Sequence, residues 1–151
     1  HLSSVFPLNA VVCAATVLQF KDVIGTRLLT PLFHKIIPFR DKRLSYPKIL
    51  RNNMKIYGYS VWPMSAVNEM RKLTNKVKKI LPIITIPTLI IHSDKDILSL
   101  PSNATLVYNS ISSEYKEKLI VKKANHNLFV DSSDQDYIFQ KINSFFNQFH
   151  V

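Results

Sequence analysis

The chain has 151 residues, 46% hydrophobic and 20% charged, which is the composition of a folded globular domain and excludes a disordered segment. A single cysteine excludes a disulfide within the chain, and no apolar run reaches the about 18–20 residues of a membrane span. Without such a run or a signal-like start, we expect a cytoplasmic protein, with peripheral membrane contact as the alternative. The chain begins with His1 rather than Met and has two glycines, few for a complete α/β enzyme, so we expect a piece of a longer protein.

The net charge of +10 comes from one internal segment. Residues 35–79 hold twelve Lys and Arg and two acidic residues, while the other eight basic residues balance the other eight acidic ones. This segment admits three interpretations: a solvated helical face, a lid that meets anionic lipid or an acidic substrate, or a nucleic-acid-binding surface. The aromatic residues interleaved with the basic ones suit a membrane interface. No nucleic-acid motif is present, so we expect no specific nucleic-acid binding.

The first half of the chain begins with a strand pattern and continues with helix patterns. Residues 10–15 form a short apolar run typical of a buried parallel strand. Apolar residues recur every four positions over residues 24–36, which predicts one or two short helices. Residues 40–62 mix basic and aromatic side chains without a clean period. Ser65 is the expected N-cap of a helix that extends to Ile80.

The second half alternates strands and helices more regularly. Strands are predicted at residues 88–91 and 117–122, with a helix between them that begins near Pro101. A last helix is expected after Ser132 or Ser133 as its cap. The order strand, helical insertion, strand, helix, strand, helix predicts an α/β fold, in which parallel strands are covered by helices on both faces.

Two titratable side chains follow the predicted strands of the second half. Asp96 comes after the run 88–91, and His126 after the run 117–122. The carboxyl ends of parallel strands open onto the crevice where ligands bind, so an enzyme site is favoured there. Asp94 lies closer to the strand end and stays open as the alternative acid. Each residue also has a structural interpretation, as a turn residue, a helix cap or a loop histidine.

No other pattern points to a cofactor or metal. His92 and His34 lack metal-ligand spacing to other His, Cys or acidic residues, so we expect no metal site and no cofactor. The run Asn103-Ala104-Thr105 matches a glycosylation sequon by pattern only, inside a predicted helix.

The segment IPTLIIHSDKDILSLPSNATLVYNSISSEYKEKLIVKKANHNLFVDSSDQDYIFQKINSFF, residues 86–146, resembles the C-terminal end of the carboxylesterase and monoacylglycerol-lipase branch of the α/β-hydrolases. In that family a strand leads to the catalytic Asp, a Pro and a helix follow, and the next strand leads to the catalytic His. The resemblance implies that Asp96 is the triad acid and His126 the triad base. FPLNAVVCAAT resembles the strand after the nucleophile helix, and residues 20–82 take the place of the helical cap. Residues 1–151 would then be a single partial hydrolase domain.

The chain departs from the family pattern at two kinds of position. Asn125 stands where the family has Gly before the His, and we expect this Asn to adopt the unusual backbone angles that Gly often serves. No Gly-x-Ser-x-Gly, the motif that carries the nucleophile, occurs in the chain, so we expect its serine upstream of His1.

The resemblance implies a serine-type ester hydrolase acting on monoglycerides or short carboxylesters. This chain would supply the cap, the acid and the base, and would be inactive alone. Its partners would be an acyl ester substrate and the missing N-terminal half, or a second copy paired at an exposed sheet edge. The alternative is a non-catalytic hydrolase-like module whose basic cap binds a membrane or an acidic partner.

Overall fold

The computed structural model describes residues 2–20, 25, 29–45, 59–130 and 133–149. The secondary-structure elements follow the chain as η1 (Leu2–Ser4), β1 (Val11–Ala14), α1 (Thr30–Phe33), β2 (Phe39–Asp41), η3 (Lys42–Ser45), β3 (Val61–Pro63), α2 (Met64–Ile80), η5 (Leu81–Ile83), β4 (Thr88–Ser93), α3 (Ser102–Ser110), β5 (Lys116–Val121) and α4 (Gln135–Asn147). Among the described helices, none combines the length and apolar character needed to cross a bilayer.

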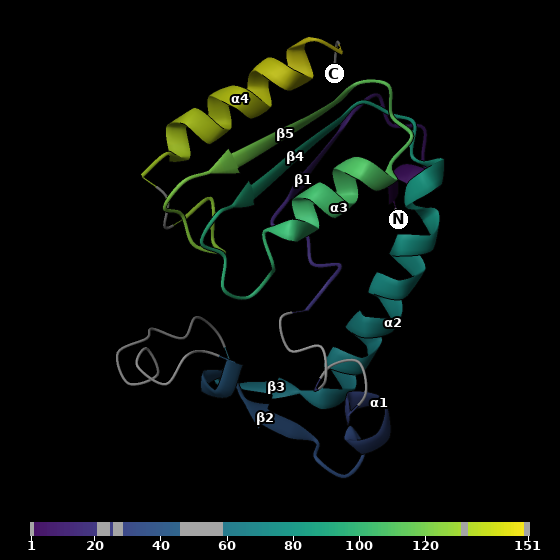
Figure 1. Cartoon of the computed structure of the whole chain (residues 1–151), viewed down its shortest axis with the longest axis vertical. Helices are drawn as coiled ribbons and strands as arrows, with labels where there is room; N and C mark the ends of the chain where they lie inside the picture. Colours follow the sequence, from purple (N-terminus) through teal and green to yellow (C-terminus); the bar gives the residue numbers. More distant parts are fainter. Residues whose placement is uncertain (1, 21–24, 26–28, 46–58, 131–132, 150–151) are drawn as a thin grey trace.

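A parallel sheet of three strands in the order β1-β4-β5 forms the centre of the fold (Figure 1). All six residues of β4 are buried, which explains why this strand is a continuous apolar run followed by His92 and Ser93. Ala14 pairs with Ile91, and Ser93 pairs with Val121. The carboxyl ends of β4 and β5 therefore lie side by side, and the loops that follow them start from the same edge of the sheet.

Helices cover both faces of this sheet, as the order of elements predicted. Successive side chains of β4 point to opposite faces, so Ile90 joins one apolar cluster while Leu89 and Ile91 join the other. The first cluster involves α3 and η5, and consists of Leu18, Leu81, Ile84, Ile90, Ala104, Val107 and Ile111. The second involves α4, and consists of Leu89, Ile91, Val121, Ala124, Leu128, Ile138 and Phe145. The α/β class with parallel strands and covering helices is confirmed.

The insertion between β1 and β4 contains a strand pair as well as helices. β2 and β3 are antiparallel, with Arg40 opposite Trp62, in the stretch that showed no clean period. Figure 1 shows this pair and α1 away from the sheet, joined to it by the long helix α2. Of the helices predicted over residues 24–36, the structure has α1, while residues 24 and 26–28 lie outside the described residues. That residues 20–82 act as a cap remains a prediction.

The predicted caps of two helices were wrong. α2 begins at Met64, one residue before Ser65, because the chain passes directly from β3 into the helix and the Met64 N–H donates to the Pro38 carbonyl at 2.8 Å. The strand pair thus decides where this helix begins. α4 begins at Gln135 after Asp134 rather than after Ser133, and Ser132 lies outside the described residues.

Candidate active site

The loops after β4 and β5 are fastened to each other by short polar contacts. The Asp94 N–H donates to the Val121 carbonyl at 3.1 Å, and the Lys123 N–H donates to Asp94 Oδ1 at 2.9 Å. The Ser93 hydroxyl donates to the Ala124 carbonyl. These bonds hold the two loops in one register, which brings Asp96 and His126 together although they are 30 residues apart in the chain.

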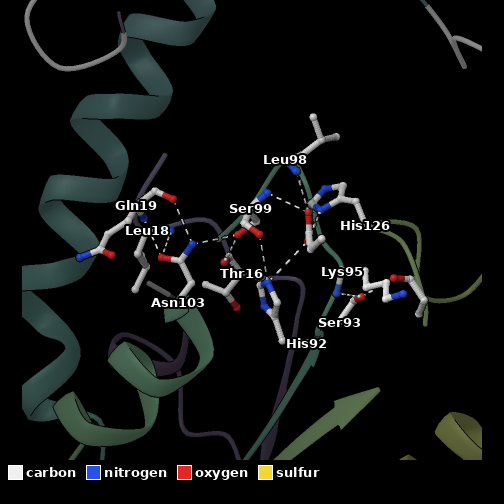
Figure 2. Close-up of polar contacts among 12 residues, drawn as sticks. Thr16, Leu18, Gln19, His92, Ser93, Lys95, Leu98, Ser99, Asn103 and His126 are labelled. Atoms are coloured by element: carbon white, nitrogen blue, oxygen red, sulfur yellow. Dashed lines mark hydrogen bonds and ion pairs between the residues drawn. The ribbon is translucent and has the colours of Figure 1, made fainter. Parts of the chain in front are cut away.

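The Asp96 carboxylate and the His126 imidazole form a hydrogen-bonded pair (Figure 2). Nδ1 of His126 lies 2.8 Å from Oδ2 of Asp96. The other carboxylate oxygen, Oδ1, accepts the N–H groups of Leu98 and Ser99 at 2.9 and 2.8 Å. The Asp96 side chain is fully buried, whereas the His126 side chain is 31% exposed. The backbone therefore fixes the carboxylate, and the carboxylate orients an imidazole that solvent can reach.

The contact between Asp96 and His126 shifts their two pKa values in opposite directions. Burial would raise the pKa of Asp96, but the hydrogen bonds from His126, Ser99 and Leu98 outweigh it and hold that pKa below the usual 3.8. The hydrogen bond to Asp96 raises the pKa of His126 above 6.5, and burial offsets only part of this effect. With Asp96 ionised, Nδ1 of a neutral His126 carries the proton, so Nε2 is the ring nitrogen able to accept one.

Asp94, the alternative acid, occupies a different position. It is exposed, and its Oδ1 accepts the Lys123 N–H, so it braces the loop after β5. The expectation for Asn125 was wrong. Among the described residues other than glycine, the positive φ angles belong to Ala15 and to Lys123, which has φ of 61°. Lys123 takes the left-handed conformation because its N–H must reach the Asp94 carboxylate, at a cost of about 1–2 kcal/mol.

His92 lies next to the pair inside the sheet. Its side chain is fully buried, and Nε2 is 3.5 Å from both Oδ2 of Asp96 and the carbonyl oxygen of Ser99. Nδ1 of His92 has no hydrogen-bond partner among the described residues. No group of three or more potential metal ligands occurs in the described part of the chain. His92 therefore presents a polar ring edge to Asp96, a contact that no sequence pattern predicted.

Two further residues of the site carried no sequence signal. Ser99 and Asn103 connect the Asp96 loop to residues 16–19, which follow β1 (Figure 2). Their partners lie 83 to 85 residues away along the chain, so no local pattern could have found them. In the sequence, Asn103 was marked only as the first residue of a glycosylation sequon. Its side chain is fully buried, which closes it to modification in the folded protein.

The model of the family described as serine aminopeptidase, S33 (Hydrolase_4) matches residues 8–133, which is most of the chain. The chain belongs to this family of α/β-hydrolases. No curated protein sequence matches this S33-family chain.

Solved structures of lipolytic enzymes share the fold of this S33-family chain. A structure described with LipS and LipT, two metagenome-derived lipolytic enzymes, superposes with a TM-score of 0.75 at 22% identity over 97% of the chain. The monoacylglycerol lipase of Paleococcus ferrophilus gives 0.69 at 14% identity over 93%. A soluble variant of the Saccharomyces cerevisiae monoglyceride lipase, in complex with a substrate analogue, gives 0.68 at 13% identity over 93%. The chain spans 59%, 60% and 56% of these proteins, respectively.

Proposed function

We propose that this S33-family chain supplies the acid, Asp96, and the base, His126, of a serine-type ester hydrolase of the carboxylesterase or monoacylglycerol-lipase kind. The observation that carries the proposal is the 2.8 Å contact between His126 Nδ1 and Asp96 Oδ2 at the ends of adjacent parallel strands. Membership of a hydrolase family and likeness to lipolytic enzymes support the reaction class. The substrate class proposed is an acyl ester, such as a monoglyceride or a short carboxylester.

The pair suits the proton transfers of acyl transfer. In the proposed reaction, Nε2 of His126 takes the proton of a serine hydroxyl as that oxygen attacks the ester carbonyl. Asp96 holds the imidazole in the tautomer with the proton on Nδ1 and stabilises the imidazolium that forms. His126 then gives the proton to the leaving alcohol, and the same steps with water release the acid.

The proposed serine lies outside these 151 residues, because the sequence contains no Gly-x-Ser-x-Gly. Among the described strands, β1 lies at one edge of the parallel sheet, and an edge strand can offer its outer N–H and C=O groups to a further strand. We propose that the segment with the serine pairs there, and self-association through the same edge is the alternative. The purified chain is then expected to leave p-nitrophenyl esters intact. If the pure chain turned these esters over robustly and His126→Ala abolished that turnover, the proposal that the nucleophile lies outside these 151 residues would be refuted.

The decisive experiment uses the complete protein and two histidine variants. His126→Ala should lower kcat for a monoglyceride or a p-nitrophenyl ester by about 10³-fold or more, because the base is lost. His34→Ala is the control, since His34 bonds to the Thr30 and Pro31 carbonyls in the insertion. Its kcat should stay within about threefold of wild type. Near-normal rates in His126→Ala would contradict the proposal.

A second candidate function is a non-catalytic module whose basic cap binds an anionic membrane. Lys72, Lys76 and Lys79 are exposed at positions that share one face of α2, and Lys72 also pairs with Glu69 at 2.7 Å. Near α1 and β2, Leu32, Ile36 and Phe39 leave 60 to 73% of their surface exposed. Basic and apolar side chains together are what an anionic bilayer surface attracts. An acidic protein partner is the alternative ligand of this surface.

Vesicle binding by a complete protein that hydrolyses no ester would favour this candidate over the enzyme. Replacing Lys72, Lys76 and Lys79 by Gln should reduce partition onto phosphatidylserine vesicles by about 10²-fold, because each lysine near the surface contributes about 1 kcal/mol. Replacing Lys95, Lys122 and Lys123, exposed lysines outside the insertion, removes the same charge and should have little effect. Equal losses in both triple variants, or no binding by the wild type, would exclude the insertion as a membrane-binding surface.

A further inference from the structure

The side chain of Asn103 links two parts of the chain that are far apart in sequence. Asn103 lies near the start of α3 and is fully buried. Its Oδ1 accepts the N–H groups of Leu18 and Gln19 at 3.2 and 2.7 Å. Its Nδ2 donates to the Gln19 carbonyl at 3.0 Å and to the Ser99 hydroxyl oxygen at 2.9 Å. Both donor hydrogens and both acceptor positions of the amide are thus used.

Ser99 joins this link to the proposed acid. Its hydroxyl donates to the Thr16 carbonyl at 2.9 Å and accepts the bond from Asn103. The backbone N–H of the same residue donates to Asp96 Oδ1 at 2.8 Å. Ser99 also forms an isolated antiparallel bridge with Phe20. A displacement of Ser99 would therefore move one of the two backbone donors that hold the carboxylate.

We infer that Asn103 and Ser99 are positioning residues that hold the Asp96 loop against residues 16–19, where the chain leaves β1 for the insertion. The inference rests on the proposed function, because positioning has a catalytic meaning only if Asp96 and His126 act as acid and base. Hydrogen bonds lead from Leu18 and Gln19 through Asn103 and Ser99 to the Asp96 carboxylate and His126. Figure 2 shows Asn103 and Ser99 between Gln19 and His126.

Such a restraint is needed because catalysis tolerates only a small displacement of the catalytic groups. A catalytic group must be held within about 0.5 Å of its productive position, and loops reach that precision only when neighbouring contacts restrain them. The Asp96 loop has no strand or helix of its own between Ser93 and Ser102. Contacts from the buried amide of Asn103 supply the restraint. They also connect Asp96 to residues 16–19, where the insertion begins. A movement of residues 16–19 would therefore displace the Asp96 carboxylate.

The experiment compares two variants of the network with two matched controls in the complete protein. Asn103→Ala and Ser99→Ala remove the link. Asn68→Ala removes another buried asparagine, whose Oδ1 accepts a bond from Arg71 in α2, and Ser113→Ala another buried serine, which donates to the Tyr115 carbonyl. Each variant is measured for kcat and KM, for unfolding by denaturant, and for the pKa of His126 by NMR titration.

Asn103→Ala and Ser99→Ala should each lower kcat by about 10- to 100-fold, with KM changed less than about threefold, because substrate-independent positioning of the acid is lost. The pKa of His126 should move down towards 6.5 as its bond to Asp96 loosens. The controls should keep kcat within about twofold and leave the pKa of His126 unchanged.

An unchanged His126 pKa together with a kcat loss no greater than that of the matched control would overturn the inference and leave a purely structural role. If Asn103→Ala does not fold, Ser99→Ala decides, because it removes a single hydroxyl group. If the wild-type protein hydrolyses no ester, the proposed function fails. The His126 titration still decides whether Asn103 and Ser99 position Asp96, so the two failures can be told apart.

Discussion

Replacing Asp96 by Asn inverts one hydrogen bond and leaves the shape of the side chain almost unchanged. The oxygen of the new amide must stay where Oδ1 is, because it accepts the N–H groups of Leu98 and Ser99. Turning the NH₂ group to that side would leave both N–H groups without an acceptor, which costs about 1–3 kcal/mol for the buried Ser99 N–H alone. The NH₂ group therefore takes the position of Oδ2 and faces Nδ1 of His126, which lies 2.8 Å from that position. His126 must then accept at Nδ1 and carry its proton on Nε2, the nitrogen that would need to act as the base.

The expected magnitude follows from this tautomer change. Asn in place of the acid of a Ser–His–Asp triad lowers kcat by about 10⁴-fold, because the neutral base is held in the wrong tautomer. We expect a loss of about 10³–10⁴-fold in the complete protein, equivalent to about 4–5.5 kcal/mol of transition-state stabilisation. The pKa of His126 should fall as well, because the bond to the Asp96 carboxylate is the main cause of its upward shift.

The assay measures kcat and KM on a p-nitrophenyl ester for Asp96→Asn and for Asp94→Asn, with circular dichroism to verify folding. Asp94 is exposed and bonds to the Lys123 N–H, which an amide oxygen can also accept, so Asp94→Asn should keep kcat within about threefold. A folded Asp96→Asn protein with kcat within tenfold of wild type would refute the reasoning. A large loss confined to Asp94→Asn would identify Asp94 as the acid.

Further predictions concern pH and the core. Because the pKa of His126 is raised and the base must be neutral, the acid limb of the kcat/KM profile should have its midpoint above 6.5. The stabilisation due to His126 is fully present below pH 6.5 and is lost as pH rises through its raised pKa; that of Asp96 is present above 3.8 and is lost as pH falls through its lowered pKa. Denaturant unfolding should therefore show the contribution of the pair at its largest between about pH 4 and 6.5. His126→Gln is the comparison, because it lacks the contribution of the imidazole while Asp96 keeps its bonds from Leu98 and Ser99. A stability difference between the two proteins that does not change with pH would contradict the linkage. Phe145→Ala should lower the free energy of unfolding by about 3–5 kcal/mol, since Phe145 is fully buried among other aromatic rings, whereas Phe139→Ala, 44% exposed, should cost less than about 1 kcal/mol. Equal losses in these two variants would show that Phe145 is not part of the core.

Local patterns were sufficient for the three strands of the parallel sheet and for the two candidate residues. A buried parallel strand needs a continuous apolar run, so β1 and β4 are visible in the sequence, and parallel strands place their carboxyl ends at one edge. The prediction that Asp96 and His126 follow neighbouring strands depends on nothing else. The resemblance of residues 86–146 to α/β-hydrolases agrees with the family that matches residues 8–133.

Features that depend on distant partners could not be predicted. The pair β2–β3 is stabilised by pairing across the insertion rather than by its own period, and that pairing starts α2 at Met64 instead of after Ser65. Left-handed backbone geometry falls on Lys123 rather than Asn125, because Asp94 in the other loop binds the Lys123 N–H.

The sequence by itself determined the class of fold, the location of the excess positive charge and the candidacy of Asp96 and His126, because hydrophobic period and residue type are local properties. Only the tertiary structure decided which aspartate meets the imidazole. Asp94 and Asp96 differ by two residues, yet one faces solvent and the other is buried against His126. The same holds for Asn103 and Ser99, whose hydrogen bonds to Leu18, Gln19 and Thr16 exist only once the chain has folded those distant segments together.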